Sequence, residues 1–147
     1  MKTIVLTGHG GIDKLEYHLD WPTPEPEQGE VQIKVGACGL NNTDINTRTA
    51  WYSRGVTEGI TDRGAEQGYQ SADDADGGWG SSAITFPRIQ GADVVGVVSS
   101  VGQGVSRSRI GQRVLVDPWL LAPGDWMDPA RSRYLGSECD GGYAEFM

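Results

Sequence analysis

The residues best suited to chemistry stand together between Gly36 and Arg48, where an apolar stretch turns polar within a few positions. The run Asn41-Asn42-Thr43-Asp44 offers two amides, a hydroxyl and a carboxylate. Such groups can donate hydrogen bonds to an oxygen that gains negative charge, or can carry a proton. Because polar side chains at the end of a strand usually lie at the mouth of a packed scaffold, we expect a binding site here.

A strand and a helix are expected to hold this polar run in place. Apolar and polar residues alternate over 31–35, which predicts a strand leading into the site. Asn41 is a favourable helix N-cap and Asp44 suits a first turn, so a helix of about two turns should follow. Asp44 and Arg48 are four residues apart, and they could form an ion pair on one face of that helix.

The remaining sequence predicts a mainly β domain with many turns. Its 147 residues, 37% of them hydrophobic, include 22 glycines, which fits one domain rich in tight turns. Residues 53–85 are rich in Gly, Ser, Asp and Glu, so we expect an inserted, partly ordered loop there. Residues 117–136 are expected to form another loop. Further strands are expected at 3–7, 15–20, 110–116, 143–146 and within 89–105, the last buried on both faces because its valine run is so dense.

Charge disfavours two classes of partner, and cysteine content indicates the redox setting. Twenty acidic against twelve basic residues give a net charge of −8, which disfavours binding to nucleic acid or to an anionic membrane. No apolar run approaches the ~20 residues that cross a bilayer. Two cysteines, Cys38 and Cys139, make no disulfide framework, so we expect a reduced, cytoplasmic setting.

Four short motifs follow one another along the chain, namely Ala37 to Asp44, Pro87 to Gly102, Gly111-Gln112-Arg113-Val114 and Gly141-Gly142-Tyr143-Ala144-Glu145. Each is weak alone, but in this order they resemble the N-terminal, GroES-like catalytic domain of the medium-chain dehydrogenase/reductase superfamily. The resemblance covers nearly the whole chain. It implies a GroES-like, partly open β-barrel with a few short helices over residues 1–147. The glycine fingerprint of a Rossmann cofactor domain is absent from this chain.

The resemblance also implies that no zinc is bound. Asn41 stands where zinc-dependent members carry a catalytic cysteine ligand, and Ala92 stands where they carry a histidine. Zinc needs nitrogen or sulfur ligands at ~2.0–2.3 Å, and Ala92 supplies none. Residues 118–138 lack the four cysteines of the structural zinc site. Cys38, on the other side of the turn glycine, is expected to point elsewhere.

Without zinc, the chain resembles the quinone oxidoreductase-like branch. This implies the substrate-side domain of an oxidoreductase that reduces a quinone, an enone or another activated carbonyl compound with NADPH or NADH. The full-length enzyme would be a homodimer or homotetramer, and this piece alone should be inactive. The resemblance names Asn41, Thr43 and Tyr52 as candidate catalytic residues and Asn41, Asn42 and Asn46 as candidate cofactor-binding residues.

Simpler interpretations stay open. Asn41 could serve only as a helix cap and Tyr52 only as a core anchor. His9 and His18 are expected to be ordinary surface histidines, and the acidic run over 73–76 a solvated loop. For the whole protein, the alternatives are a relative of zinc-type alcohol dehydrogenases that has lost its metal, or a non-catalytic GroES-like binding module.

Overall fold

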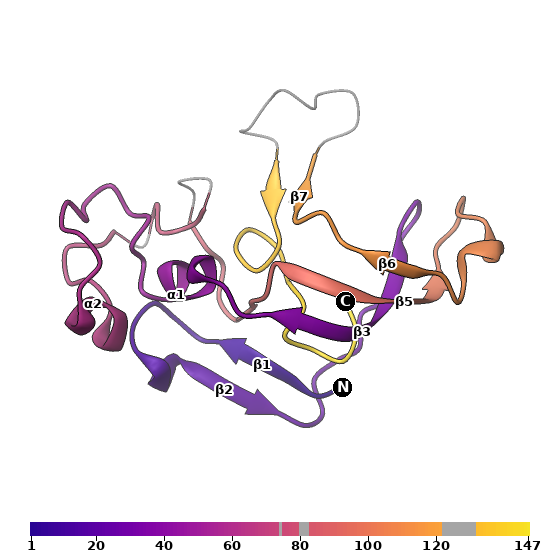
Figure 1. Ribbon diagram of the computed structural model, residues 1–147, viewed down its shortest axis with the longest axis horizontal. Coiled ribbons are helices and arrows are strands. Elements are labelled where there is room, and N and C mark those ends of the chain that lie inside the picture. Colours follow the sequence, from indigo (N-terminus) through magenta and orange to yellow (C-terminus); the bar gives the residue numbers. More distant parts are fainter. Residues whose placement is uncertain (74, 80–82, 122–131) are drawn as a thin grey trace.

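The computed structural model describes residues 1–73, 75–79, 83–121 and 132–147 and shows a mainly β domain with short helices (Figure 1). This confirms the expected fold class. All strand pairs are antiparallel and form three sheets, in the orders β2-β1-β4, β3-β5-β6 and β7-β8, which do not close into a barrel. The elements are β1 (Thr3–Leu6), β2 (Leu15–His18), β3 (Val31–Gly39), α1 (Asn42–Arg48), α2 (Asp62–Gln67), β4 (Arg88–Ile89), β5 (Asp93–Val101), β6 (Arg113–Leu115), β7 (Trp119–Leu120) and β8 (Arg133–Tyr134), with 3₁₀ turns at Ile12–Lys14 and Arg107–Arg109.

A bulge in β3 decides which side chains reach the site. Ile33 and Cys38 are five positions apart, so in a regular strand they would point to opposite faces. Each nevertheless lies opposite a fully buried valine of β5, Val98 and Val94 respectively. The register shifts at Gly36, which has no partner in the ladder. This extra residue flips the alternation and turns Cys38 inward.

Strand β5 is buried on one face only, so the prediction of burial on both faces is wrong. Val94 and Val98 are fully buried, whereas the side chains between them, Val95 and Val97, are 44% and 37% exposed. β-branched residues are favoured in strands whether or not both faces are covered. A dense valine run therefore indicates a strand without fixing how many of its faces are buried.

The C-terminal residues join the two larger sheets. Ile4 of β1 donates its N–H to the carbonyl of Tyr143 at 2.9 Å, and Ile33 of β3 donates to the carbonyl of Met147 at 2.8 Å. The expected strand over 143–146 is therefore a connecting segment with isolated bridges to each sheet. Its position fixes Tyr143 beside the end of β3.

The predicted pair of Asp44 with Arg48 is wrong. The Arg48 guanidinium donates to the carbonyl of Gly10 at 2.6 Å and to that of Ala65 at 2.9 Å. The residue is 6% exposed, and burial lowers the pKa of its guanidinium. Arg48 thus ties α1 to the loop after β1 and to α2, while the Asp44 carboxylate turns to other donors.

His9 is not the surface histidine that the sequence predicted. Its Nδ1 lies 3.0 Å from the carbonyl of Thr47, and its ring meets the Phe86 ring edge-on at 4.9 Å. Its Nε2 is covered and has no partner among the described residues. The His9 ring therefore lies between the end of β1, α1 and the segment before β4, and it packs against them.

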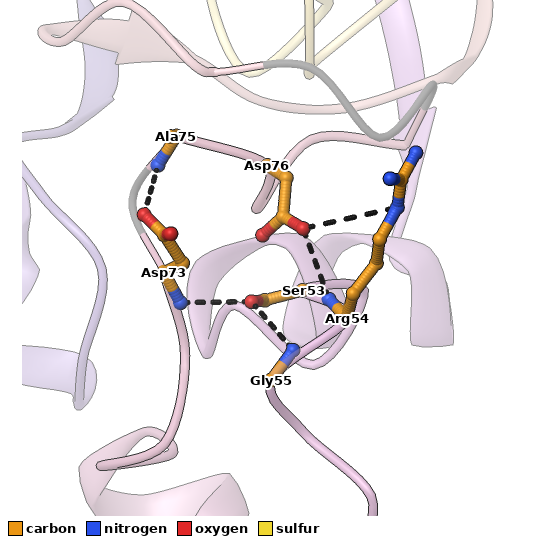
Figure 2. Close-up of polar contacts among 6 residues, drawn as sticks. All are labelled: Ser53, Arg54, Gly55, Asp73, Ala75 and Asp76. Atoms are coloured by element: carbon orange, nitrogen blue, oxygen red, sulfur yellow. Dashed lines mark hydrogen bonds and ion pairs between the residues drawn. The ribbon is translucent and has the colours of Figure 1, made fainter.

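The inserted stretch 53–85 contains α2 and a local hydrogen-bond network (Figure 2). Ser53 Oγ accepts from the N–H of Asp73 at 2.8 Å, and the Asp76 carboxylate accepts from the N–H of Arg54 at 3.2 Å. These bonds connect the start of the stretch to residues about twenty positions later.

Two expectations fall partly outside the described residues. Asp74, within the acidic run 73–76, is one of the residues left undescribed. The stretch 117–136, expected as a loop, contains the paired strands β7 and β8, and 122–131 lie outside the described part. The assignment of 117–136 as a continuous loop is therefore wrong at both of its ends.

Candidate functional site

Asp44 in α1 accepts hydrogen bonds from three separate segments. Its Oδ2 accepts from the N–H of Asn41 at 2.9 Å and from the hydroxyl of Tyr143 at 2.8 Å, and its Oδ1 accepts from the N–H of Gly91 at 3.1 Å. Gln90 also donates its side-chain amide to the Asp44 carbonyl at 2.8 Å. Asp44 is 9% exposed. A buried carboxylate with this many donors joins the turn, the end of β4 and the C-terminal segment into one rigid unit.

Asn41 lies at the surface of that unit. The helix begins immediately after it, so Asn41 occupies the N-cap position, and its backbone N–H donates to the Asp44 carboxylate. Its side-chain Nδ2 donates to Asp93 Oδ2 at 2.8 Å, and both residues are exposed. An amide nitrogen has two hydrogens. Asp93 accepts one of them, and the second has no acceptor among the described residues.

The other predicted site residues differ from one another in exposure and in their contacts. Asn42 is exposed next to Asn41, whereas the Thr43 hydroxyl is covered and has no partner among the described residues. Burial raises the pKa of Tyr52, and the nearby Asn46 amide acts in the opposite direction. Tyr52 therefore stays protonated near neutral pH. The catalytic and cofactor-binding roles of these residues remain predictions.

Cys38 and Tyr143 line the inner side of the site, and the sequence indicated neither as a site residue. Burial, followed by the charges of Asp44 and Asp93, raises the pKa of the Cys38 thiol to about 11, so it is not a thiolate at neutral pH. Burial and the hydrogen bond to Asp44 also raise the pKa of Tyr143. Between these two side chains lies Gly91, at φ +99°, where a Cβ would stand 2.6 Å from Cys38 Sγ and 2.8 Å from the Tyr143 ring. Only glycine fits this place.

An aromatic wall, consisting of Trp51, Tyr52, Trp79, Trp119 and Tyr134, borders the same region. The Tyr52 ring meets Trp51 at 5.7 Å and Trp79 at 4.8 Å, both edge-on. Trp79 stacks on Tyr134 at 5.1 Å with 24° between the ring planes, and Trp119 meets Tyr134 edge-on at 5.1 Å. Rings from α1's end, the inserted stretch and the β7–β8 hairpin thus form one continuous group. Of these five residues, only Trp51 and Tyr52 are neighbours in the sequence.

The side chains at this place do not suit zinc. Ala92 is 2% exposed and carries no donor atom, and Asn41 offers an amide. Across the described residues, no group of three or more His, Cys, Asp or Glu side chains is placed to hold a metal ion. A stable zinc site needs several converging nitrogen, sulfur or carboxylate ligands. We therefore derive no chemistry from a metal here.

Comparison with known proteins identifies the family. Residues 27–147 match the model of the alcohol dehydrogenase GroES-like domain. The chain belongs to the alcohol dehydrogenase GroES-like domain family. This is the N-terminal domain of the medium-chain dehydrogenase/reductase superfamily, as its motifs predicted.

Relatives of this GroES-like domain include oxidoreductases. It is 28% identical over 146 residues to rat quinone oxidoreductase, covering 99% of the chain and 30% of that protein. It is 32% identical over 129 residues to the rat synaptic vesicle membrane protein VAT-1 homolog, covering 87% of the chain and 24% of that protein.

Solved structures agree with this assignment. A candidate alcohol dehydrogenase from Sinorhizobium meliloti 1021 superposes on the whole chain and on 37% of its own, at 41% identity and a TM-score of 0.75. An NAD-dependent alcohol dehydrogenase matches the whole chain and 36% of its own, at 27% identity and a TM-score of 0.72. The GroES-like domain therefore spans about a third of these relatives or less. No helix in its described part is long and apolar enough to cross a bilayer.

Proposed function

We propose that this GroES-like domain is the substrate-side part of a zinc-independent oxidoreductase that reduces a quinone, an enone or another activated carbonyl compound. The supporting observation is the amide of Asn41. One of its hydrogens is held by Asp93 and its backbone by buried Asp44, so the second hydrogen has a fixed place at the mouth of the site. At the neighbouring position where a metal ligand would be needed, Ala92 has no donor.

The chemistry assigned to the chain's own residues is stabilisation of charge. When hydride adds to the carbonyl carbon, or to the β-carbon of an enone, the oxygen gains negative charge, and a fixed N–H donor stabilises it. Asn41 would supply that donor. Tyr52, which stays protonated because burial raises its pKa, would donate a hydrogen bond or the final proton.

NADPH or NADH would supply the hydride when bound. The two exposed amides, Asn41 and Asn42, are the groups best placed to contact a nicotinamide, while Asn46 is only half-exposed. Support for a nicotinamide cofactor comes from the similar structure that is described as NAD-dependent. The nucleotide-binding part would lie outside these 147 residues. We further propose a cytoplasmic homodimer or homotetramer, which agrees with two free cysteines.

The test is oxidation of NADPH and NADH by the natural full-length protein with 1,4-naphthoquinone or an enone, together with metal analysis of the same sample. Asn41→Ala should lower kcat about 100-fold, the usual loss when one oxyanion donor is removed. Gln103→Ala removes an exposed amide from a distant turn and should change nothing. A stoichiometric zinc requirement, or no oxidation by the folded protein, would refute the proposal.

A further inference from the structure

We propose that a cavity beside β2, called here the β2 cavity, binds a small quaternary ammonium compound, with Trp21 as the ring against which the cation lies and Glu16 as its counter-charge. The cavity has a volume of about 290 Å³ and is open to solvent. Its lining includes Val5, Glu16, His18, Trp21, Phe86 and Pro87. None of these residues belongs to the candidate functional site, so this inference does not depend on the proposed function.

Strand β2 brings an acid and a ring to one face of its sheet. Glu16 and His18 are two positions apart in the strand, so their side chains point to the same side. In the ladder with β1, Glu16 lies opposite Val5 and His18 opposite Thr3. Val5 is 1% exposed, whereas Glu16 is exposed. The β2 cavity therefore has an apolar floor and a carboxylate at its rim.

Three rings line the β2 cavity. The ring centroids of Trp21 and His18 are 5.0 Å apart, with 64° between the ring planes. Phe86 supplies the third ring and meets His9 edge-on at 4.9 Å. Trp21 and Phe86 are both half-exposed, so each keeps accessible ring surface. Rings set at an angle around one space can recognise a quaternary ammonium group, because the negative face of each ring attracts the cation.

The backbone of Trp21 is fixed before a ligand binds. Its N–H donates to the Met1 carbonyl at 3.0 Å, and its own carbonyl accepts from the N-terminal ammonium group. Because Pro22 follows, the backbone of Trp21 is also restricted to extended conformations. A ring on a fixed backbone loses little conformational freedom when a ligand lies against it.

The charge beside these rings is negative. Glu16 Oε2 lies 3.3 Å from His18 Nε2, and the other carboxylate oxygen of Glu16 has no partner among the described residues. No lysine or arginine is among the described residues that line the cavity. Lys14, the nearest lysine in the sequence, lies 3.3 Å from the Asp13 carboxylate. A carboxylate beside rings, without a cation next to it, favours a positively charged ligand.

The lining favours a quaternary over a primary ammonium group. A primary ammonium is strongly hydrated and has three N–H donors that need acceptors. Glu16 supplies the only carboxylate among the described lining residues, and the floor and most of the walls are apolar or aromatic. A quaternary ammonium has no N–H group and meets the rings with its methyl groups, so contact with this lining leaves no donor unpaired.

The experiment titrates the natural full-length protein with choline, with its neutral isostere 3,3-dimethylbutan-1-ol and with ethanolamine, and follows the nuclear magnetic resonance signals of each ligand. Choline should bind about tenfold more tightly than either of the other two. Trp21→Ala should weaken choline binding about fivefold, and Trp21→Phe should weaken it less, because a phenyl ring attracts a cation less than an indole does. Glu16→Gln should weaken it about threefold, as expected for an exposed ion pair.

Glu58→Gln is the matched control for the loss of charge. Glu58 is exposed in the inserted stretch and does not line the β2 cavity, so this variant should bind choline as the wild type does. Thermal unfolding shows whether each variant keeps its fold. Trp21 also lines a larger apolar cavity, which Phe86 does not. Phe86→Leu therefore tests the β2 cavity alone, should weaken choline binding about threefold, and replaces Trp21→Ala if the latter does not fold.

Three results would overturn the inference. The first is equal affinity for choline and for the neutral alcohol. The second is choline binding that is unchanged in folded Phe86→Leu and Glu16→Gln. The third is an equal loss of affinity in Glu58→Gln and Glu16→Gln, which would trace the binding to the net charge of the chain and not to this cavity.

Discussion

The two halves of the candidate site are built by different interactions. Around Asp44, one buried carboxylate collects backbone and side-chain donors from three segments. The aromatic wall, in contrast, is held by ring contacts between 4.8 and 5.7 Å. Hydrogen bonds are directional, so those to Asp44 hold the surrounding residues in one geometry. Ring contacts depend less on direction, so a ring surface can bind different ligands. We therefore expect the Asp44 side to determine stability and geometry and the wall to determine which ligand binds.

Removing the Asp44 carboxylate should have the largest effect on the free energy of unfolding. In Asp44→Ala, the donors of Asn41, Tyr143 and Gly91 lose their acceptor, and the free energy of unfolding should fall by about 4 kcal/mol, because each buried donor left unpaired costs about 1–3 kcal/mol. Urea unfolding followed by circular dichroism measures this. Asp20→Ala, at an exposed position, is the control and should stay within about 0.5 kcal/mol. A loss of under 1 kcal/mol for Asp44→Ala would contradict the hub.

The next largest effect is expected for Gly91→Ala. The added Cβ would stand 2.6 Å from Cys38 Sγ and 2.8 Å from the Tyr143 ring, at a φ of +99°. We expect a loss of about 3 kcal/mol in the free energy of unfolding. Gly104→Ala separates strain from clash, because φ is +87° there and nothing lies within 4 Å. If both variants lose the same amount, the packing around Gly91 is not the cause.

Shortening the wall should have a smaller effect on stability. Tyr134→Leu removes the stacking on Trp79 and the edge-on contact with Trp119. The free energy of unfolding should fall by about 1 kcal/mol, the usual worth of such ring pairs beyond their buried area. The same urea titration measures it. A loss as large as that of Asp44→Ala would show that both halves carry the fold and would remove the distinction between them.

The smallest expected effect is a dependence on alkaline pH. The pKa of the Cys38 thiol is raised from 9.0 to about 11 in the folded protein. The unfolded chain therefore loses this proton first, and the contribution to stability is complete below pH 9 and lost as the pH rises to about 11. Urea midpoints at pH 8, 9.5 and 10.5 should fall less in Cys38→Ala than in the wild type. Parallel curves for the two proteins would contradict the burial of the thiol.

Several features were predictable because they depend on neighbours in the sequence. The helix after Asn41 follows from a capping residue and an acid in the first turn, and α1 has the expected length. The polar residues from Asn41 to Asp44 do stand at the end of a strand, β3, as the alternation before them indicated. Such signals depend only on neighbouring residues, and the structure contains the elements they predicted.

Other features depend on contacts between distant segments and could not be predicted. Asp44 pairs with Tyr143, 99 residues away, and not with nearby Arg48. Cys38 faces the site because one unpaired residue, Gly36, changes the phase of β3. The sequence contains no mark of either, because a buried group takes whichever donors the folded chain supplies.

The sequence by itself determined the mainly β class, the polar turn at Asn41 and the family, since strand alternation, capping and motif order are properties of short segments. Only the tertiary structure decided what surrounds that turn. It showed Asp93 holding the Asn41 amide and placed Trp79, Tyr134 and Trp119 together. Rings that lie between positions 51 and 134 of the sequence form one group only when packing brings their segments side by side.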